Sequence, residues 1–175
     1  MNKTKTILIY TLMFVILLFI QIYIIDIKNL FGVKPDILLI MVIVSSLWNN
    51  LKFSSICSLL IGIYLDILYR NEFGIYTLGF VLVSTIIGYI NTNYKRDSKM
   101  TLIYITFLGT TIFEIYKYIT YMIISNTAIG VMFLVKQIII SAILNMIISF
   151  ILYNVFVKIH KSIYNDDEYV LNKIK

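Results

Sequence analysis

Six long apolar stretches follow one another along this chain, and only short polar connections separate them. An α-helix rises about 1.5 Å per residue, so about 20 mostly apolar residues cross a hydrocarbon core about 30 Å thick. The stretches that approach this length are residues 6–25, 36–51, 53–68, 75–90, 100–125 and 133–157. The pattern predicts an all-α, polytopic integral membrane protein whose six transmembrane helices form one helical bundle, with no soluble domain between them.

The composition agrees with a chain that lies largely in lipid. Of its 175 residues, 60% are hydrophobic and 14% are charged. These values exclude a soluble globular domain, because such a domain hides only part of its apolar surface from water. One cysteine, Cys57, and one histidine, His160, provide neither a disulfide framework nor a zinc site. We therefore expect no metal and no cofactor.

The basic residues lie mainly between the apolar stretches, where they orient a membrane protein rather than bind nucleic acid. With six spans and a cytoplasmic N-terminus, most of the 15 Lys and Arg residues fall on the cytoplasmic side. The stretch 36–51 is the weakest candidate for a span, because its apolar run already ends at Trp48. It either spans the bilayer or is re-entrant. If it does not cross, five spans with an external N-terminus give the same charge asymmetry. Lys3 and Lys5 directly precede the first stretch, which favours six spans with both termini, and the tail 158–175, in the cytoplasm.

Small and polar side chains recur every four residues on two of the predicted spans. One row lies on the third stretch and the other on the sixth; their members are Ser54, Ser58, Gly62, Asp66, and Gln137, Ser141, Asn145, Ser149. Lipid gives helices no hydrophobic reason to associate, so such rows mark the faces that pack together. We interpret both rows as helix-packing faces. A ligand cavity or a partner surface is the alternative.

A charged pair interrupts the fifth stretch. Glu114 lies close to its middle and Lys117 follows three residues later, so the two side chains share a helix face. A lone charge at bilayer depth costs about 2.5 to 3.5 kcal/mol, and a pair offsets part of that cost. We predict a buried structural ion pair, joined by Lys136 from the next span. The alternative is a proton or substrate site.

Asp66 stands near the end of the third stretch with Arg70 and Glu72 close behind, which predicts a hydrogen-bonded turn at the membrane boundary. No Ser or Cys has a His partner, and the sequence contains neither a nucleotide-binding loop nor a second intramembrane Asp at protease spacing. We therefore predict that the chain is not an enzyme.

Short segments in a fixed order carry a family resemblance. Along the chain they are Lys34-Pro35-Asp36, then Gly62 with Asp66 four residues later, then Phe73-Gly74, and finally Gly88-Tyr89. This order resembles the rod-shape-determining membrane protein family MreD. The family motif carries over to Pro35, Asp36, Gly62, Asp66 and Gly74.

These motif residues also have a physical reading. Proline suits the first turn of a helix, and an early Asp complements the positive end of the helix dipole. Gly62 permits close approach of two backbones, and Gly74 permits a tight turn into the fourth stretch. The motif therefore predicts architectural roles for its residues.

The resemblance implies a non-catalytic scaffold or adaptor of the bacterial cell-elongation machinery, which controls rod shape and peptidoglycan synthesis. Similar proteins sit in the cytoplasmic membrane beside the bitopic protein MreC. They act with MreB, RodA and a class B penicillin-binding transpeptidase, directly or indirectly. These partners and the lipid bilayer are what the resemblance leads us to expect, and it names no contact residues.

A second hypothesis is a substrate-binding membrane subunit similar to those of energy-coupling-factor vitamin transporters. Those subunits also have six spans, and they dock their transporter through small residues at four-residue spacing on the first and third helices. Here the third stretch carries such residues, but the first is bulky throughout residues 7–25. This departure favours the scaffold.

Overall fold

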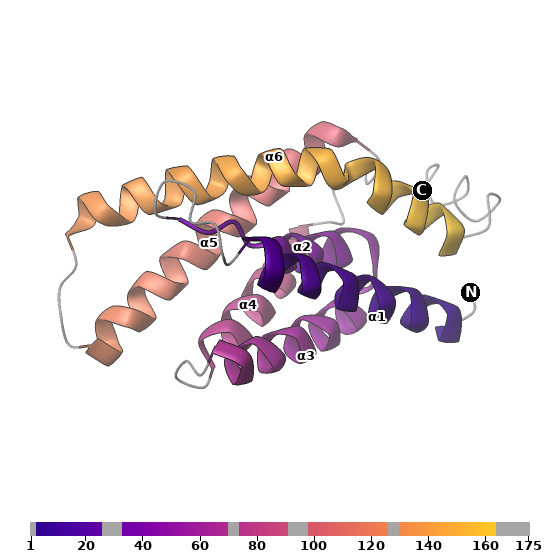
Figure 1. Ribbon diagram of the computed structural model, residues 1–175, viewed down its shortest axis with the longest axis horizontal. Coiled ribbons are helices and arrows are strands. Elements are labelled where there is room, and N and C mark those ends of the chain that lie inside the picture. Colours follow the sequence, from indigo (N-terminus) through magenta and orange to yellow (C-terminus); the bar gives the residue numbers. More distant parts are fainter. Residues whose placement is uncertain (1–2, 26–32, 70–73, 91–97, 126–129, 164–175) are drawn as a thin grey trace.

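The structure is a computed structural model that describes residues 3–25, 33–69, 74–90, 98–125 and 130–163 (Figure 1). Within these ranges the chain forms six α-helices: α1 Lys3–Ile20, continued by the π-helical turn η1 Gln21–Ile25, α2 Ile37–Trp48, α3 Leu51–Tyr69, α4 Ile75–Ile90, α5 Lys99–Ser125 and α6 Val131–Ile163. The predicted helical bundle is confirmed. The last helix runs past position 157, so the first residues of the predicted tail are helical, and residues 164–175 lie outside the described ranges.

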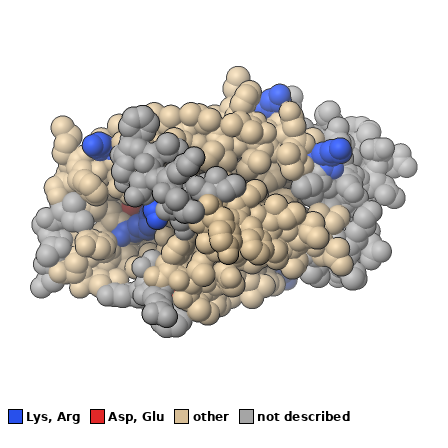
Figure 2. Space-filling view, viewed as in Figure 1, with Lys and Arg blue, Asp and Glu red and all other residues tan. Residues whose placement is uncertain are grey.

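The helices differ in length. By length and composition α3, α5 and α6 can each cross a membrane, whereas α1, α2 and α4 are shorter apolar helices. Much of the outer surface is apolar: Figure 2 shows a face on which most described atoms are uncharged and Lys or Arg side chains appear at a few separate places. Such a surface suits contact with lipid.

The short helix α2 lies at the centre of the bundle. Each of its 12 residues is buried, and it packs against α1, α3, α4, α5 and α6. Its first turn lies beside Gln21 at the end of α1, and Asn49, just past its last turn, donates a hydrogen bond to the Tyr10 hydroxyl near the start of α1. The helix therefore runs antiparallel to α1 and does not turn back. A helix enclosed by protein does not have to match the thickness of the bilayer, which explains its length.

The start of α1 and the end of α6 lie at the same end of the bundle (Figure 1). We call this the terminal end and the opposite one the far end. The chain then enters α2 and α4 from the far end, and α5 and α6 are antiparallel, with Lys99 beside Tyr153 and Thr110 beside Asn145. At the far end α5 and α6 extend beyond the other helices (Figure 1).

Candidate functional site

Asp66 holds the start of α4 from the last turns of α3. Its carboxylate accepts hydrogen bonds from the backbone N–H of Gly74 (3.1 Å), Tyr76 (2.9 Å) and Thr77 (3.1 Å). The Thr77 hydroxyl donates a fourth, at 2.5 Å. The first N–H groups of a helix have no partner inside it, and a negative charge there is stabilised by the helix dipole. The side chain, 2% exposed, therefore caps α4 from a neighbouring helix.

The two glycines of this junction are required by geometry. A methyl group on Gly62 would lie 2.8 Å from the backbone nitrogen of Thr77 and closer still to its Cα, so α3 and α4 meet backbone to backbone here. Gly74 has φ of +108°, a conformation that side chains of L-residues rarely adopt. Its carbonyl accepts a hydrogen bond from the Tyr116 hydroxyl of α5, at 3.3 Å. The junction is thus tied to a third helix.

A second cluster of polar groups surrounds the start of α2. The Gln21 side-chain amide donates to the carbonyl of Pro35 (3.2 Å) and accepts from the backbone N–H of Ile37 (2.9 Å). The Asp36 carboxylate accepts from the backbone N–H of Leu39 at 2.9 Å, which makes it the N-cap of α2. Gln21 begins the π-helical turn η1, so the altered winding at the end of α1 lies where this contact is made.

Asn145 of α6 completes the cluster. Its side-chain oxygen accepts a hydrogen bond from the backbone N–H of Asp36 at 2.9 Å, and its NH₂ group donates to the Thr110 hydroxyl of α5 at 3.2 Å. Both Asn145 and Thr110 are buried. Side chains from η1 and α6 therefore bind the start of α2, and Asn145 links this cluster to Thr110 of α5.

The serines of the two predicted rows donate hydrogen bonds within their own helices. Ser54, Ser58, Ser141 and Ser149 are buried, and Gln137 is half-buried. Each serine hydroxyl donates to a carbonyl three or four residues earlier in its own helix. These serines therefore act as small side chains that let helices approach, whereas Asn145 makes a contact across helices.

The contact between Thr110 and Asn145 sets the register of α5 against α6. Because the helices are antiparallel and neighbours on one face are four residues apart, Thr106 lies opposite Ser149, and Glu114 lies opposite Ser141. All of these side chains are buried. A polar seam therefore runs between α5 and α6.

Glu114 and Lys117 form an ion pair of 2.8 Å on α5. The Glu114 side chain is 8% exposed and that of Lys117 28%, and the Lys117 ammonium lies 4.8 Å from the centre of the Phe113 ring. Lys136 of α6 is exposed, and among the described residues no ion pair joins it to Glu114. The expectation that Lys136 joins the pair is therefore wrong, since its side chain is exposed to the surroundings of the bundle.

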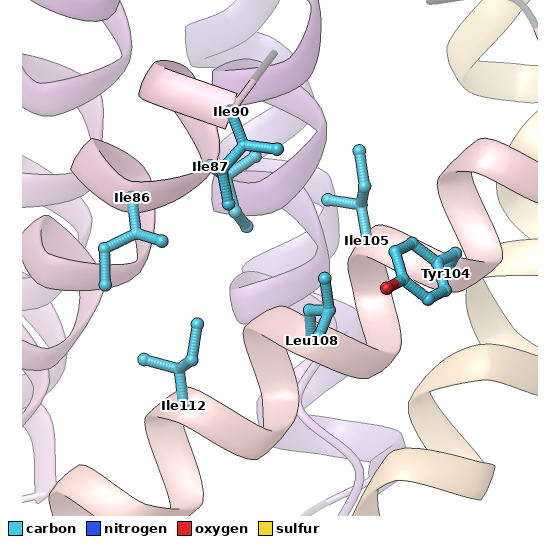
Figure 3. A pocket seen from close by; sticks show the side chains of 7 residues that line it. All are labelled: Ile86, Ile87, Ile90, Tyr104, Ile105, Leu108 and Ile112. Atoms are coloured by element: carbon cyan, nitrogen blue, oxygen red, sulfur yellow. The ribbon is translucent and has the colours of Figure 1, made fainter. Parts of the chain in front are cut away.

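A recess between α4 and α5 is too small for an organic ligand. Its wall is apolar apart from one tyrosine hydroxyl, and Figure 3 shows the lining residues Ile86, Ile87, Ile90, Tyr104, Ile105, Leu108 and Ile112. The volume is about 10 Å³, against about 300 Å³ or more for typical ligand pockets. Within the described ranges, no three His, Cys, Asp or Glu side chains are grouped so as to hold a metal ion.

The model of the rod shape-determining protein MreD family matches residues 1–163. The chain belongs to the MreD family. The resemblance predicted from its motifs is confirmed. Searches of curated proteins and of solved structures gave no match.

In this MreD-family protein the five motif residues fall into two similar arrangements. Pro35 and the N-cap Asp36 directly precede α2, so the proline lies just before the helix and not in its first turn, while Gly62, Asp66 and Gly74 set the start of α4. The two helices run side by side from the far end, and the Ser46 and Ser84 hydroxyls join them at 2.9 Å. The acidic motif residues thus cap a parallel pair of helices.

Sequence reasoning missed the partners of the motif. Gln21, Thr77, Thr110 and Tyr116 all bind motif residues or Asn145, yet none stands out by spacing. Gln21 was the one polar side chain within the long apolar stretch 7–25 apart from Tyr and Thr, and this isolation is a usable signal.

Proposed function

We propose that this protein is a non-catalytic scaffold or adaptor of the cell-elongation complex and that it binds an MreC-like bitopic membrane protein. Membership of the MreD family gives it a role in rod shape determination. The proposal adds how that role is carried out: a rigid bundle holds a membrane partner beside the enzymes of wall synthesis.

The observation that carries the proposal is the use made of the acidic motif residues. The Asp66 carboxylate accepts four hydrogen bonds from the start of α4, and the Asp36 carboxylate caps α2. The Asp66 carboxylate thus fixes α4 against α3, and the Asp36 carboxylate stabilises the start of its own helix; both have architectural roles. A motif with this architectural role suits a scaffold, which acts by binding partners on its surface.

The proposed setting is the bacterial cytoplasmic membrane, crossed by all six helices, with both termini in the cytoplasm. Lys3, Lys5 and the basic residues of 95–99 then lie inside, in agreement with the positive-inside rule. MreB, RodA and a class B penicillin-binding transpeptidase belong to the same assembly, through direct contact or through the MreC-like protein.

Purification from native membranes tests the proposal. The tagged full-length protein should recover the MreC-like protein of the same organism, and its depletion should convert rod-shaped cells to round ones. A tagged unrelated six-span protein serves as control. Recovery of a transporter ATPase module, with no protein of wall synthesis, would contradict the scaffold and favour the vitamin-transporter hypothesis.

A further inference from the structure

The ion pair of Glu114 and Lys117 ties no two helices together. Asp66 fixes α4 against α3, and Asn145 links α6 to the start of α2 and to α5. By contrast, among the described residues the polar partner of Glu114 is Lys117 alone, on its own helix. Ser141, which lies opposite on α6, donates its hydroxyl to carbonyls of its own helix. The arrangement of the helices therefore does not explain this pair.

The pair also lies well inside a helix that can cross a membrane. By length and composition α5 is one of the three described helices with this property. At a rise of about 1.5 Å per residue, Glu114 is about 22 Å from the first residue of α5 and about 16 Å from its last. Ionised groups are costly at such a depth, and those that proteins keep there mark functional sites. The pair is therefore a candidate for a role beyond folding.

Both members of the pair keep unused hydrogen-bonding capacity. The Lys117 ammonium donates to Oε1 of Glu114, and among the described residues neither side chain makes another hydrogen bond. The second carboxylate oxygen, Oε2, thus lacks a donor. In the described part of the chain Ser55 Oγ is the one fully enclosed side-chain polar atom without a partner, so Oε2 can be reached from outside. The Lys117 side chain is 28% exposed and has further N–H groups to donate.

The two charged groups are held in fixed positions. The Lys117 ammonium lies 4.8 Å from the centre of the Phe113 ring, which attracts a cation over its face. Phe113 is fully buried and its ring packs against that of Phe80, with 5.0 Å between the centres. The buried ring therefore anchors the ammonium, and the ion pair in turn orients the carboxylate. A group that binds there meets an acceptor and donors already in place, which lowers the cost of ordering them.

Lipid does not provide the missing partner. Acyl chains surround this level of a membrane-spanning helix, and they have no hydrogen-bonding groups. The group that fits donates to Oε2 of Glu114 and accepts from the Lys117 ammonium at the same time. The amide of Asn or Gln does both, as does the hydroxyl of Ser or Thr. Such side chains form hydrogen bonds between neighbouring helices in membranes.

We infer that Glu114 and Lys117 are the polar contact point for the membrane-spanning helix of the partner. An Asn, Gln, Ser or Thr side chain of that helix binds Oε2 of Glu114 and the Lys117 ammonium. The inference rests on the proposed function and adds to it the residues of this chain that make the contact and the chemistry of the group that they bind.

Removal of both charges separates binding from folding. The full-length double variant Glu114→Leu/Lys117→Met leaves no charge unpaired, so its unfolding midpoint in detergent should equal or exceed that of the unmodified protein. Its recovery of the MreC-like protein of the same organism should fall about tenfold. Thr120→Val is the matched control on α5, because the Thr120 hydroxyl already donates to the Tyr116 carbonyl at 2.9 Å. Its recovery of the complex should be unchanged.

Changes in the partner helix test the chemistry of the contact. Each Asn, Gln, Ser and Thr of the membrane helix of the MreC-like protein is replaced in turn by Leu. One of these replacements should lower recovery by the unmodified chain about tenfold. The same replacement should cause no further loss with the Glu114→Leu/Lys117→Met variant, because both changes remove one contact.

The outcomes separate this inference from the proposed function. Full recovery of the complex by the double variant overturns the inference and leaves the proposed function standing, as do losses that multiply independently in the two proteins. A lower unfolding midpoint of the double variant assigns the pair to the fold of the bundle, and that result also overturns the inference. Failure of the unmodified chain to recover any complex contradicts both.

Discussion

At the residue scale, the acidic groups of the family motif act on backbone N–H groups. Asp66 reaches the first turn of α4 from α3, so it replaces a local N-cap by a tertiary one. The sequence placed Asp66 at a hydrogen-bonded turn, but Thr77 was not identified, because an apolar stretch gives no sign of which backbone groups face another helix. Its other expected neighbours, Arg70 and Glu72, lie outside the described residues.

Removal of the Asp66 carboxylate should destabilise the α3–α4 junction. In Asp66→Ala, several N–H groups at the start of α4 lose their acceptor, at a cost of about 3 kcal/mol. Thermal unfolding of the purified protein in detergent measures the loss. Thr77→Val removes only the hydroxyl donor and should cost about 1 kcal/mol. Equal unfolding midpoints for Asp66→Ala and the unmodified protein would rule out the capping role.

The glycine at the same junction gives a second prediction. In Gly62→Ala the new methyl group meets the backbone of Thr77, which cannot move aside as a side chain can. Because α3 and α4 must separate, we expect a loss of about 2 kcal/mol or more. Gly88→Ala is the matched control, since its methyl group would meet only the Leu51 side chain, at 3.4 Å. Similar unfolding midpoints for the two variants would contradict a backbone contact at Gly62.

At the element scale, α2 shows what hydropathy does and does not reveal. Its apolar composition and its start at Pro35 and Asp36 are readable from the sequence. Its central position is not, because a short helix that is apolar on all sides has no face that distinguishes protein neighbours from lipid. The start of α4 was predictable from Gly74, whereas α6 continues past Lys158 because the helical backbone persists through a change from apolar to polar side chains.

Because Gln21 binds both a carbonyl and an N–H group at the start of α2, its replacement should loosen the attachment of α1. Gln21→Leu leaves the Pro35 carbonyl and the Ile37 N–H without this partner, and we expect a loss of about 2 kcal/mol. Gln137→Leu, at a half-buried position on α6, should change the stability by about 0.5 kcal/mol or less. Thermal unfolding of both variants under one condition measures the difference. If Gln137→Leu lowered the unfolding midpoint more than Gln21→Leu does, the role of Gln21 in attaching α1 to the start of α2 would be refuted.

At the scale of the whole molecule, the fold was predictable in kind and only partly in arrangement. Six apolar stretches with short connections lead to six helices, and the packing of α3 on α4 and of α5 on α6 follows from their short connections. The arrangement around α2 depends on Gln21, Thr110 and Asn145, residues distant in sequence whose contacts arise only in the folded bundle. The extension of α5 and α6 beyond the other helices at the far end likewise depends on contacts between these two helices at the terminal end.

The shared location of the start of α1 and the end of α6 leads to a prediction about topology. An even number of crossings keeps both termini on one side, and the proposed orientation, which follows the positive-inside rule, makes that side the cytoplasm. Single cysteines in a Cys57→Ser background, Asn2→Cys, Lys175→Cys and Gly130→Cys, can be labelled with a membrane-impermeant maleimide. In intact spheroplasts only Gly130→Cys should react, because it stands at the far end next to α6; the terminal cysteines should react after the membrane is opened. Labelling of one terminus alone in intact spheroplasts would mean an odd number of crossings, and α2 would then not span the bilayer.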